Sequence, residues 1–393
     1  MSQLRSIELF AGAGGLALGL DQCGVKPAAV VEWNKDACLT LRANALRKNL
    51  PISGWDIRQT DIRLFDFNSH VGKIDLVSGG PPCQPFSIGG KHRGFEDKRD
   101  MFPEAARAVR LLQPKAFIFE NVRGLLRRSF AKYFEYILLQ LQHPHLPPHT
   151  DENWSDHLSR LESHHTSGKY RDAFYRVVFR SVNAADYGVP QKRERVVIVG
   201  FRSDICDKWS FPDATHSEES LFIAKWGTGE YWEEHRVAKK ERPPAPSQTQ
   251  VRTVMDRNDQ LTRWCTIRDA ISDLPPPSTD KATMVQNHRL QTGAKTYPGH
   301  TGSPIDEPAK TLKAGDHGVP GGENMLAMPN GSVRYFTVRE SARLQTFPDW
   351  YVFPGSWTES MRQIGNAVPV RFAETIGKSV VEVLKRHNRR NAA

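Results

Sequence analysis

Residues 74–87 have the sequence IDLVSGGPPCQPFS, in which an apolar segment runs into glycines, prolines and a cysteine. Positions 74–77 have the length and composition of a buried strand. The two glycines and two prolines that follow can continue neither a β-ladder nor a helix. We therefore predict that the strand ends in a stiff turn and that this turn presents Cys83.

Two interpretations of Cys83 compete. A free cysteine is most often a small buried hydrophobe. Apolar burial does not require this glycine-proline turn, however, and the next segment carries Lys91, Arg93 and Arg99. Since neighbouring cations lower the pKa of a thiol, the setting favours a nucleophile. The glycines and charges of residues 88–100 predict a mobile loop that closes over substrate, although an ordinary surface loop has a similar composition.

A glycine-rich turn lies near the N-terminus. A short strand at residues 6–10 leads into Ala11-Gly12-Ala13-Gly14-Gly15, and a helix should begin directly after it. This order lets the backbone approach a bound nucleotide closely. A second strand, at 28–31, ends at Glu32, at the offset where an acidic side chain binds ribose hydroxyls. Without the glycine turn, Glu32 would be interpreted as a solvated carboxylate.

Further reactive groups are predicted at the same sheet edge. A buried strand at 116–119 ends at Glu120, and open parallel sheets bind ligands beyond the carboxyl ends of their strands. Cys83 follows another such strand, so the two groups should converge. Strands at 175–179 and 196–199 flank Gln191-Lys192-Arg193-Glu194-Arg195. The two arginines offer planar donor pairs to a base carbonyl or a phosphate, and a structural ion pair is the alternative.

In this order, the motifs resemble those of the DNA (cytosine-5)-methyltransferases, particularly the type of bacterial restriction–modification systems. The resemblance rests on Phe10-Ala11-Gly12-Ala13-Gly14-Gly15, Pro82-Cys83-Gln84, Glu120-Asn121-Val122, Gln191-Lys192-Arg193-Glu194-Arg195 and Gly365-Asn366. It implies an α/β fold of the class I S-adenosylmethionine-dependent methyltransferase type, which is Rossmann-like with a mostly parallel twisted sheet, and a smaller loop-rich target-recognition domain.

The expected division of the chain follows from the resemblance. Residues 1–200 would form the catalytic and cofactor-binding domain, with a histidine-rich insertion at about 142–170. Residues 201–355 would form the target-recognition domain. Residues 356–393 would return to the catalytic domain and place Asn366 beside the glycine turn.

The resemblance also implies the reaction, in which a methyl group passes from S-adenosylmethionine to C5 of a cytosine in a short duplex DNA sequence. Cys83 would attack C6, which makes C5 nucleophilic enough to take the sulfonium methyl group. Glu120 would stabilise the charge that develops at N3, and Arg195, with Arg193, would contact the base. Attack from above the ring plane requires that the cytosine leave the base stack.

The implied cofactor, S-adenosylmethionine, has no pyrophosphate and so needs no phosphate-binding G-x-G-x-x-G. Asp61 occupies the position where the family holds the adenine amine. The candidate cofactor-binding residues are Phe10, Ala11, Gly12, Gly14, Gly15, Leu16, Glu32, Trp33, Asp61, Ile62, Pro82, Asn366 and Ala367.

The implied partner is double-stranded DNA. The 54 basic and 44 acidic residues give a net charge of +10, which suits a polyanion. The candidate DNA-contacting residues are Gln84, Ser87, Ile88, Lys91, Arg93, Arg99, Thr311 and Leu312. Thr311-Leu312 resembles the Thr-Leu pair of the family's target-recognition domains. Some members have a serine where this chain has Gly89, so Gln84, Ser87 and Ile88 remain alternatives for the side chain that fills the space left by the flipped base.

Composition sets the remaining expectations. None of the five cysteines belongs to a C-x-x-C pair, so neither a disulfide framework nor a zinc knuckle is predicted. Residues 142–170 contain six histidines without a metal-binding spacing such as H-E-x-x-H, and we interpret them as a solvated insertion without a metal. No apolar stretch has the length of a membrane span. We expect a monomer in the bacterial cytoplasm, associated with the nucleoid and functionally paired with a restriction endonuclease that it does not bind stably.

Two alternative functions remain open. A tRNA methyltransferase would share the catalytic core, but such relatives usually carry Cys-Phe-Thr where this chain has Cys265-Thr266-Ile267. A catalytically silent DNA-binding relative would not be expected to keep both Cys83 and Glu120.

Overall fold

The computed structural model describes residues 3–82, 100–170, 173–257, 260–314 and 324–390. Seven of the predicted site residues lie outside these ranges, together with nearly all of the predicted closing loop. They are Cys83, Gln84, Ser87, Ile88, Lys91, Arg93 and Arg99.

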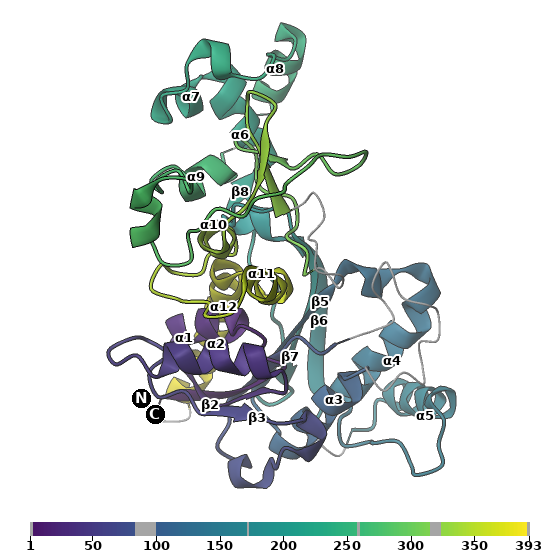
Figure 1. The fold of residues 1–393 in the computed structure, drawn as a ribbon. Coiled ribbons are helices and arrows are strands. Elements are labelled where there is room, and N and C mark those ends of the chain that lie inside the picture. Colours follow the sequence, from purple (N-terminus) through teal and green to yellow (C-terminus); the bar gives the residue numbers. More distant parts are fainter. Residues whose placement is uncertain (1–2, 83–99, 171–172, 258–259, 315–323, 391–393) are drawn as a thin grey trace.

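A seven-stranded sheet forms the centre of the described structure, with the strand order β3-β2-β1-β4-β5-β7-β6 (Figure 1). Neighbouring strands are parallel except that β7 runs antiparallel to both β5 and β6. The strands are β1 (Leu4–Leu9), β2 (Val25–Glu32), β3 (Ile57–Gln59), β4 (Leu76–Gly79), β5 (Ala116–Val122), β6 (Tyr175–Asn183) and β7 (Glu194–Arg202). The strand order reverses between β1 and β4, and open α/β sheets bind their ligands at such a point.

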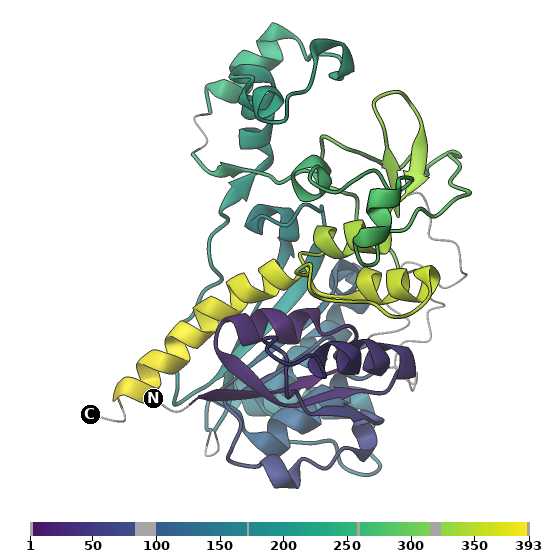
Figure 2. The same ribbon diagram turned by 60° about the vertical axis from the view of Figure 1, so that its left-hand side comes forward.

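Helices cover both faces of the sheet, which gives three layers (Figures 1 and 2). On one face lie α1 (Gly15–Gln22), α2 (Lys35–Ala45) and α12 (Val370–Arg390); on the other lie α3 (Phe102–Leu112), α4 (Ala131–Gln142) and α5 (Trp154–Ser167). Side chains of a strand alternate between its faces. Accordingly, Phe117 and Phe119 of β5 pack in the core with α3 to α5, whereas Ile118 packs in the core with α1 and α12. The predicted fold class is confirmed.

The strand expected at 74–77 is displaced along the chain. β4 spans Leu76–Gly79, so the first glycine belongs to the strand and does not end it. A Cβ atom on Gly79 would lie 2.4 Å from the backbone oxygen of Leu9 on β1. The glycine is therefore required by the close approach of two backbones inside the sheet.

The histidine-rich segment differs from the predicted solvated insertion. It contains α5, whose N-cap Asn153 accepts hydrogen bonds from the backbone of Ser155 and Asp156. Leu158 and Leu161 of this helix are buried in the core that contains α4. The apolar residues of 154–167 thus form one face of an amphipathic helix. The many histidines and serines in this segment make that apolar face difficult to recognise from composition.

The rest of the chain is built from short elements, as predicted. Beyond the sheet the structure has α6 (Glu218–Phe222), α7 (Glu230–Glu234), α8 (Gln248–Met255), α9 (Ile267–Ile271), β8 (His216–Ser217), β9 (Thr262–Arg263), β10 (Ser303–Pro304), β11 (Met325–Ala327), β12 (Val333–Tyr335), α10 (Val338–Leu344) and α11 (Trp357–Asn366). Most of them lie beyond one edge of the sheet (Figure 2). Among the described residues, no helix combines the length and the apolarity needed to cross a membrane.

Candidate active site

The glycine turn joins β1 to α1 with three residues in the left-handed region. Phe10, Gly12 and Gly14 have φ values of 53°, 54° and 77°. Gly14 is the N-cap of α1, and its backbone nitrogen donates to the oxygen of Ala11 at 2.8 Å. A non-glycine residue at positive φ is strained, and such strain is concentrated at ligand sites. The turn therefore has the geometry that the sequence predicted.

Glu32 lies directly beside this turn. Its Oε2 accepts a hydrogen bond from the backbone nitrogen of Gly12 at 2.8 Å, and its Oε1 accepts one from Asn34 at 2.7 Å. The residue is only 7% exposed. Each carboxylate oxygen has a second lone pair, so the group can accept two hydroxyl donors without losing either backbone contact.

The next candidates continue along the same edge. The backbone nitrogen of Thr60 donates to the oxygen of Glu32 at 3.0 Å, which places Asp61 beyond the end of β3. Asp61 pairs with Arg63, and the hydrogen bonds from this arginine lower the pKa of the Asp61 carboxyl. Ile62 is buried, whereas the indole of Trp33 is 74% exposed.

C-terminal residues close the opposite side of the glycine turn. A Cβ atom on Gly15 would lie 2.2 Å from the backbone oxygen of Val368, and the hydroxyl of Tyr351 donates to the oxygen of Ala13 at 2.6 Å. Asn366 is the last residue of α11 and is exposed, while Ala367 is buried. The expectation that the final motif packs back beside the glycine turn is confirmed.

Glu120 and Arg195 form an ion pair on adjacent strands. The Nε atom of Arg195 lies 2.8 Å from Oε1 of Glu120, and both side chains are nearly buried. The pair arises because β5 and β7 are antiparallel, with Val122 opposite Arg195. A Cβ atom on Gly80 would lie 3.5 Å from Oε2 of Glu120. The carboxylate is thus next to the segment that leads into Cys83.

Both described ends of that segment are fixed. The side-chain amide of Asn121 donates to the oxygen of Pro81 at 2.8 Å, and the backbone nitrogen of Met101 donates to the oxygen of Pro82 at 3.0 Å. The chain therefore leaves and re-enters the described structure at one place, beside Glu120. Pro82 itself is exposed.

Arg193 makes different contacts from Arg195. Its side chain is 1% exposed and donates to the backbone oxygens of Gly365 at 2.8 Å and Leu312 at 3.4 Å. Leu312 is also 1% exposed, and the hydroxyl of Thr311 donates to the oxygen of Lys192 at 2.7 Å. Arg193 thereby ties the Thr311-Leu312 segment and the end of α11 to the strand that carries Arg195.

Sequence reasoning missed three residues that position these groups. Asn121 holds Pro81, as described above. The fully buried Gln191 accepts a hydrogen bond from the backbone nitrogen of Leu312 at 3.0 Å, and the fully buried Asn324 exchanges two hydrogen bonds with the backbone of Lys313. Asn121 follows Glu120 directly, and Gln191 begins the segment that carries Arg193 and Arg195, so their place beside the site residues was a usable signal. Nothing in the sequence singles out Asn324.

A second carboxyl group is buried beneath the site. Glu8 of β1 lies opposite Ser78 of β4, and the Ser78 hydroxyl donates to its Oε2. Burial raises the pKa of Glu8 to about 8, although the hydrogen bond opposes this shift. Glu8 therefore retains a proton under conditions in which an exposed glutamate is ionised.

Comparison with known proteins identifies the family. The family model for C-5 cytosine-specific DNA methylases matches residues 4–144 and 156–382. The chain is 35% identical to the Type II methyltransferase M.PspPI of Psychrobacter sp. (strain TA137) over 96% of this chain and 79% of the relative. It is 31% identical to the Type II methyltransferase M.NgoMIV of Neisseria gonorrhoeae over 98% of this chain and all of the relative.

Solved structures support the fold. S. pombe Dnmt2 methyltransferase aligns with a TM-score of 0.56 and 17% identity, covering 98% of this chain and 99% of that one. The family match supports a DNA methyltransferase. It does not support the two alternatives, an RNA methyltransferase or a catalytically silent relative. The chain belongs to the C-5 cytosine-specific DNA methylase family, and it is an S-adenosylmethionine-dependent DNA (cytosine-5)-methyltransferase.

Proposed function

We propose that the chain methylates a cytosine in one short duplex sequence through a covalent Cys83 adduct. The Cys83 thiolate adds to C6, and C5 then attacks the sulfonium methyl group, which releases S-adenosylhomocysteine. The C5 proton passes to a base, the thiolate leaves, and the ring regains its aromaticity. The target cytosine must leave the base stack for this attack.

The ion pair between Glu120 and Arg195 is the observation that carries this proposal. Cytosine presents N3 and O2 at neighbouring ring positions. A carboxyl group and a guanidinium 2.8 Å apart can meet these two atoms together: Glu120 would donate to N3 in its protonated form, and Arg195 would donate to O2. Gly80 borders this pair. Cys83 follows Gly80 closely in the sequence, so the nucleophile belongs to the segment that leaves from this place.

We propose that S-adenosylmethionine binds along the adjacent edge. Glu32 would accept the ribose hydroxyls, Asp61 the adenine amine, and the exposed ring of Trp33 would contact the adenine face. The glycine turn, with Phe10, Ala11 and Leu16, would border the methionine portion, and Asn366 and Ala367 would close the other side. The buried position of Glu32 and the exposure of Trp33 both support this arrangement.

We assign DNA recognition to residues 201–355, and 1–200 with 356–393 to catalysis. The Thr311-Leu312 segment would position recognition side chains against the catalytic site, since Arg193 and Gln191 hold it there. We further propose that the enzyme acts as a monomer on chromosomal DNA in a bacterial cell. It would protect host sites from a restriction endonuclease that it does not bind stably, because its relatives are Type II methyltransferases.

The covalent step can be tested with duplex DNA that carries 5-fluorocytosine at the target position. The fluorine cannot leave as a proton does, so the adduct with Cys83 should persist and migrate as a protein–DNA complex under denaturing conditions. Cys83→Ala should give no such complex while still binding the duplex. A stable complex with Cys83→Ala would contradict the assignment of the nucleophile.

A further inference from the structure

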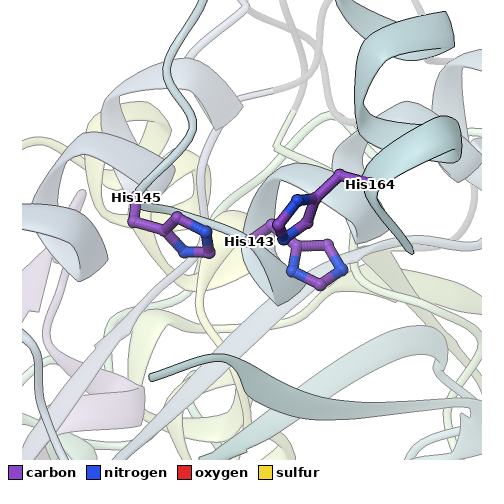
Figure 3. Close-up of side chains that lie close together, drawn as sticks. All are labelled: His143, His145 and His164. Atoms are coloured by element: carbon purple, nitrogen blue, oxygen red, sulfur yellow. The ribbon is translucent and has the colours of Figure 1, made fainter. Parts of the chain in front are cut away.

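Three histidines of the segment that follows α4 come together in the structure. His143 caps the C-terminal end of α4, His145 follows in the connecting loop, and His164 lies near the end of α5. Figure 3 shows the three side chains close together, with the rings of His143 and His164 overlapping in this view. Neither the catalytic site nor the cofactor site uses these side chains.

The geometry of the three rings fits a small cation. One ligand atom from each ring lies within 4.8 Å of the other two. For three atoms at this spacing, a point exists that is no more than about 2.8 Å from each, and zinc–imidazole bonds are about 2.0–2.1 Å long. A shift of each ring by under about 1 Å would complete the coordination.

Two of the ring nitrogens, one on His143 and one on His164, are poorly satisfied without a ligand. His143 is 1% exposed. Among the described residues, neither Nδ1 of His143 nor Nε2 of His164 has a hydrogen-bond partner, although both atoms are buried. Burying a polar atom without a partner is costly, so this arrangement favours a ligand at the centre of the cluster.

His165 adds the contact that usually accompanies a metal ligand. Its Nδ1 lies 3.0 Å from Nε2 of His143, on the side of the ring away from Nδ1. A ligating imidazole typically donates its second N–H to an acceptor, which fixes the tautomer and directs the free lone pair to the metal. His143 therefore has one nitrogen oriented by His165 and one available for coordination.

A second candidate cluster lacks these features. Glu234, His235 and Asp269 also lie close together. However, Asp269 is bound by His235 at 2.9 Å and by two nitrogens of Arg263 at 2.8 and 2.9 Å. An arginine therefore already neutralises the carboxylate of that cluster, whereas the cluster of His143, His145 and His164 contains neither a carboxylate nor an arginine.

We propose that His143, His145 and His164 bind one divalent transition-metal ion of the zinc type, with water as the fourth ligand. Three imidazoles are a suitable donor set for Zn²⁺ and a poor one for Mg²⁺ or Ca²⁺. The ion joins the C-terminal ends of α4 and α5, so it stabilises the fold of this segment. The family model omits residues 145–155, which include His145 and most of the connection between the two helices.

Metal binding by the full chain tests this proposal, with protein purified without a polyhistidine tag. After removal of bound metal, titration with Zn²⁺ should show one equivalent bound, and Co²⁺ should give the visible absorption of a tetrahedral site. His164→Gln should remove both signals. The exposed His149 offers a matched control, and His149→Gln should bind as wild type does. His165→Ala should weaken binding by about 10- to 100-fold at unchanged stoichiometry.

Thermal unfolding of the unaltered chain gives a readout that needs no variant. Zn²⁺ should raise the midpoint, and Mg²⁺ at the same concentration should not. Methyl transfer by His164→Gln would show that this variant is folded. The proposal is overturned if wild type binds no Zn²⁺, or if His164→Gln binds it as tightly as wild type.

Discussion

Arg195 of β7 and Glu120 of β5 are diagonal neighbours on adjacent antiparallel strands, with 2.8 Å between Nε and Oε1. The pair occupies the carboxyl end of β5, next to Gly80. A nearly buried carboxyl group beside a guanidinium can stabilise charge that develops on a bound base. Catalysis in the proposed mechanism therefore depends on Glu120 as well as on the nucleophile.

Replacing Glu120 by Gln should reduce kcat by about 100-fold or more, because the amide cannot supply the proton or the charge at N3. The affinity for S-adenosylmethionine should change little. Glu194→Gln is the matched control, since Glu194 lies on the same strand as Arg195 and pairs with Arg123 at the exposed surface. Steady-state methylation of duplex DNA measures both variants. Equal kcat values for Glu120→Gln and wild type would contradict the proposed role.

Replacing Glu32 by Gln should weaken S-adenosylmethionine binding by about tenfold or more, because the loss of one acceptor costs about 1–3 kcal/mol. Both carboxylate oxygens accept backbone N–H groups, so the amide would also place a donor against a donor. Asp36→Asn removes the same charge from an exposed position in α2 and should bind normally. Calorimetric titration with the cofactor distinguishes the two variants, and an unchanged Kd for Glu32→Gln would exclude the ribose contact.

Replacing Gly15 by Ala should destabilise the fold by about 1–3 kcal/mol, as overpacking does. The new methyl group would meet the backbone oxygen of Val368 at 2.2 Å, and a backbone atom cannot move aside as a flexible side chain can. Cofactor binding should weaken too, because Asn366 and Ala367 would shift with Val368. At Gly355 the nearest contact would be 3.4 Å, so Gly355→Ala should resemble wild type in urea unfolding and in cofactor affinity.

Glu8 should make the stability of the protein depend on pH. Its pKa is raised from 4.5 to about 8 in the folded state, so the native protein keeps a proton that the unfolded chain releases. The contribution of Glu8 to stability is therefore largest at low pH and is lost as the pH rises from about 5 towards 8. Glu8→Gln cannot titrate, so its free energy of unfolding relative to wild type should rise by about 4 kcal/mol between pH 5 and pH 8.

Urea unfolding at several pH values measures this difference. The exposed Glu135 provides the control, and Glu135→Gln should follow wild type at every pH. A constant difference between Glu8→Gln and wild type across this range would show that Glu8 has an ordinary pKa.

Local patterns predicted the sheet edge well. The glycine turn and the offset to Glu32 predicted their proximity, and the backbone of Gly12 does bind that carboxylate. Strand ends likewise predicted where Glu120 lies. These features depend on turns and strand lengths, which short stretches of sequence determine.

Contacts that depend on strand register could not be predicted in this way. Arg193 and Arg195 are equivalent in the sequence motif, yet only Arg195 has an ion pair with Glu120 among the described contacts. Which arginine faces the carboxylate depends on how β7 pairs with β5. The convergence of His143, His145 and His164 was missed for a similar reason, since it requires α5 to pack against α4.

Bisulfite sequencing tests the central claim most directly, using a plasmid from a methylation-free host that expresses this chain or its Cys83→Ala variant. Wild type should protect one cytosine in every copy of a single short motif, and Cys83→Ala should protect none. Protection that persists with Cys83→Ala, or no protection by folded wild type with its cofactor bound, would contradict the proposed mechanism.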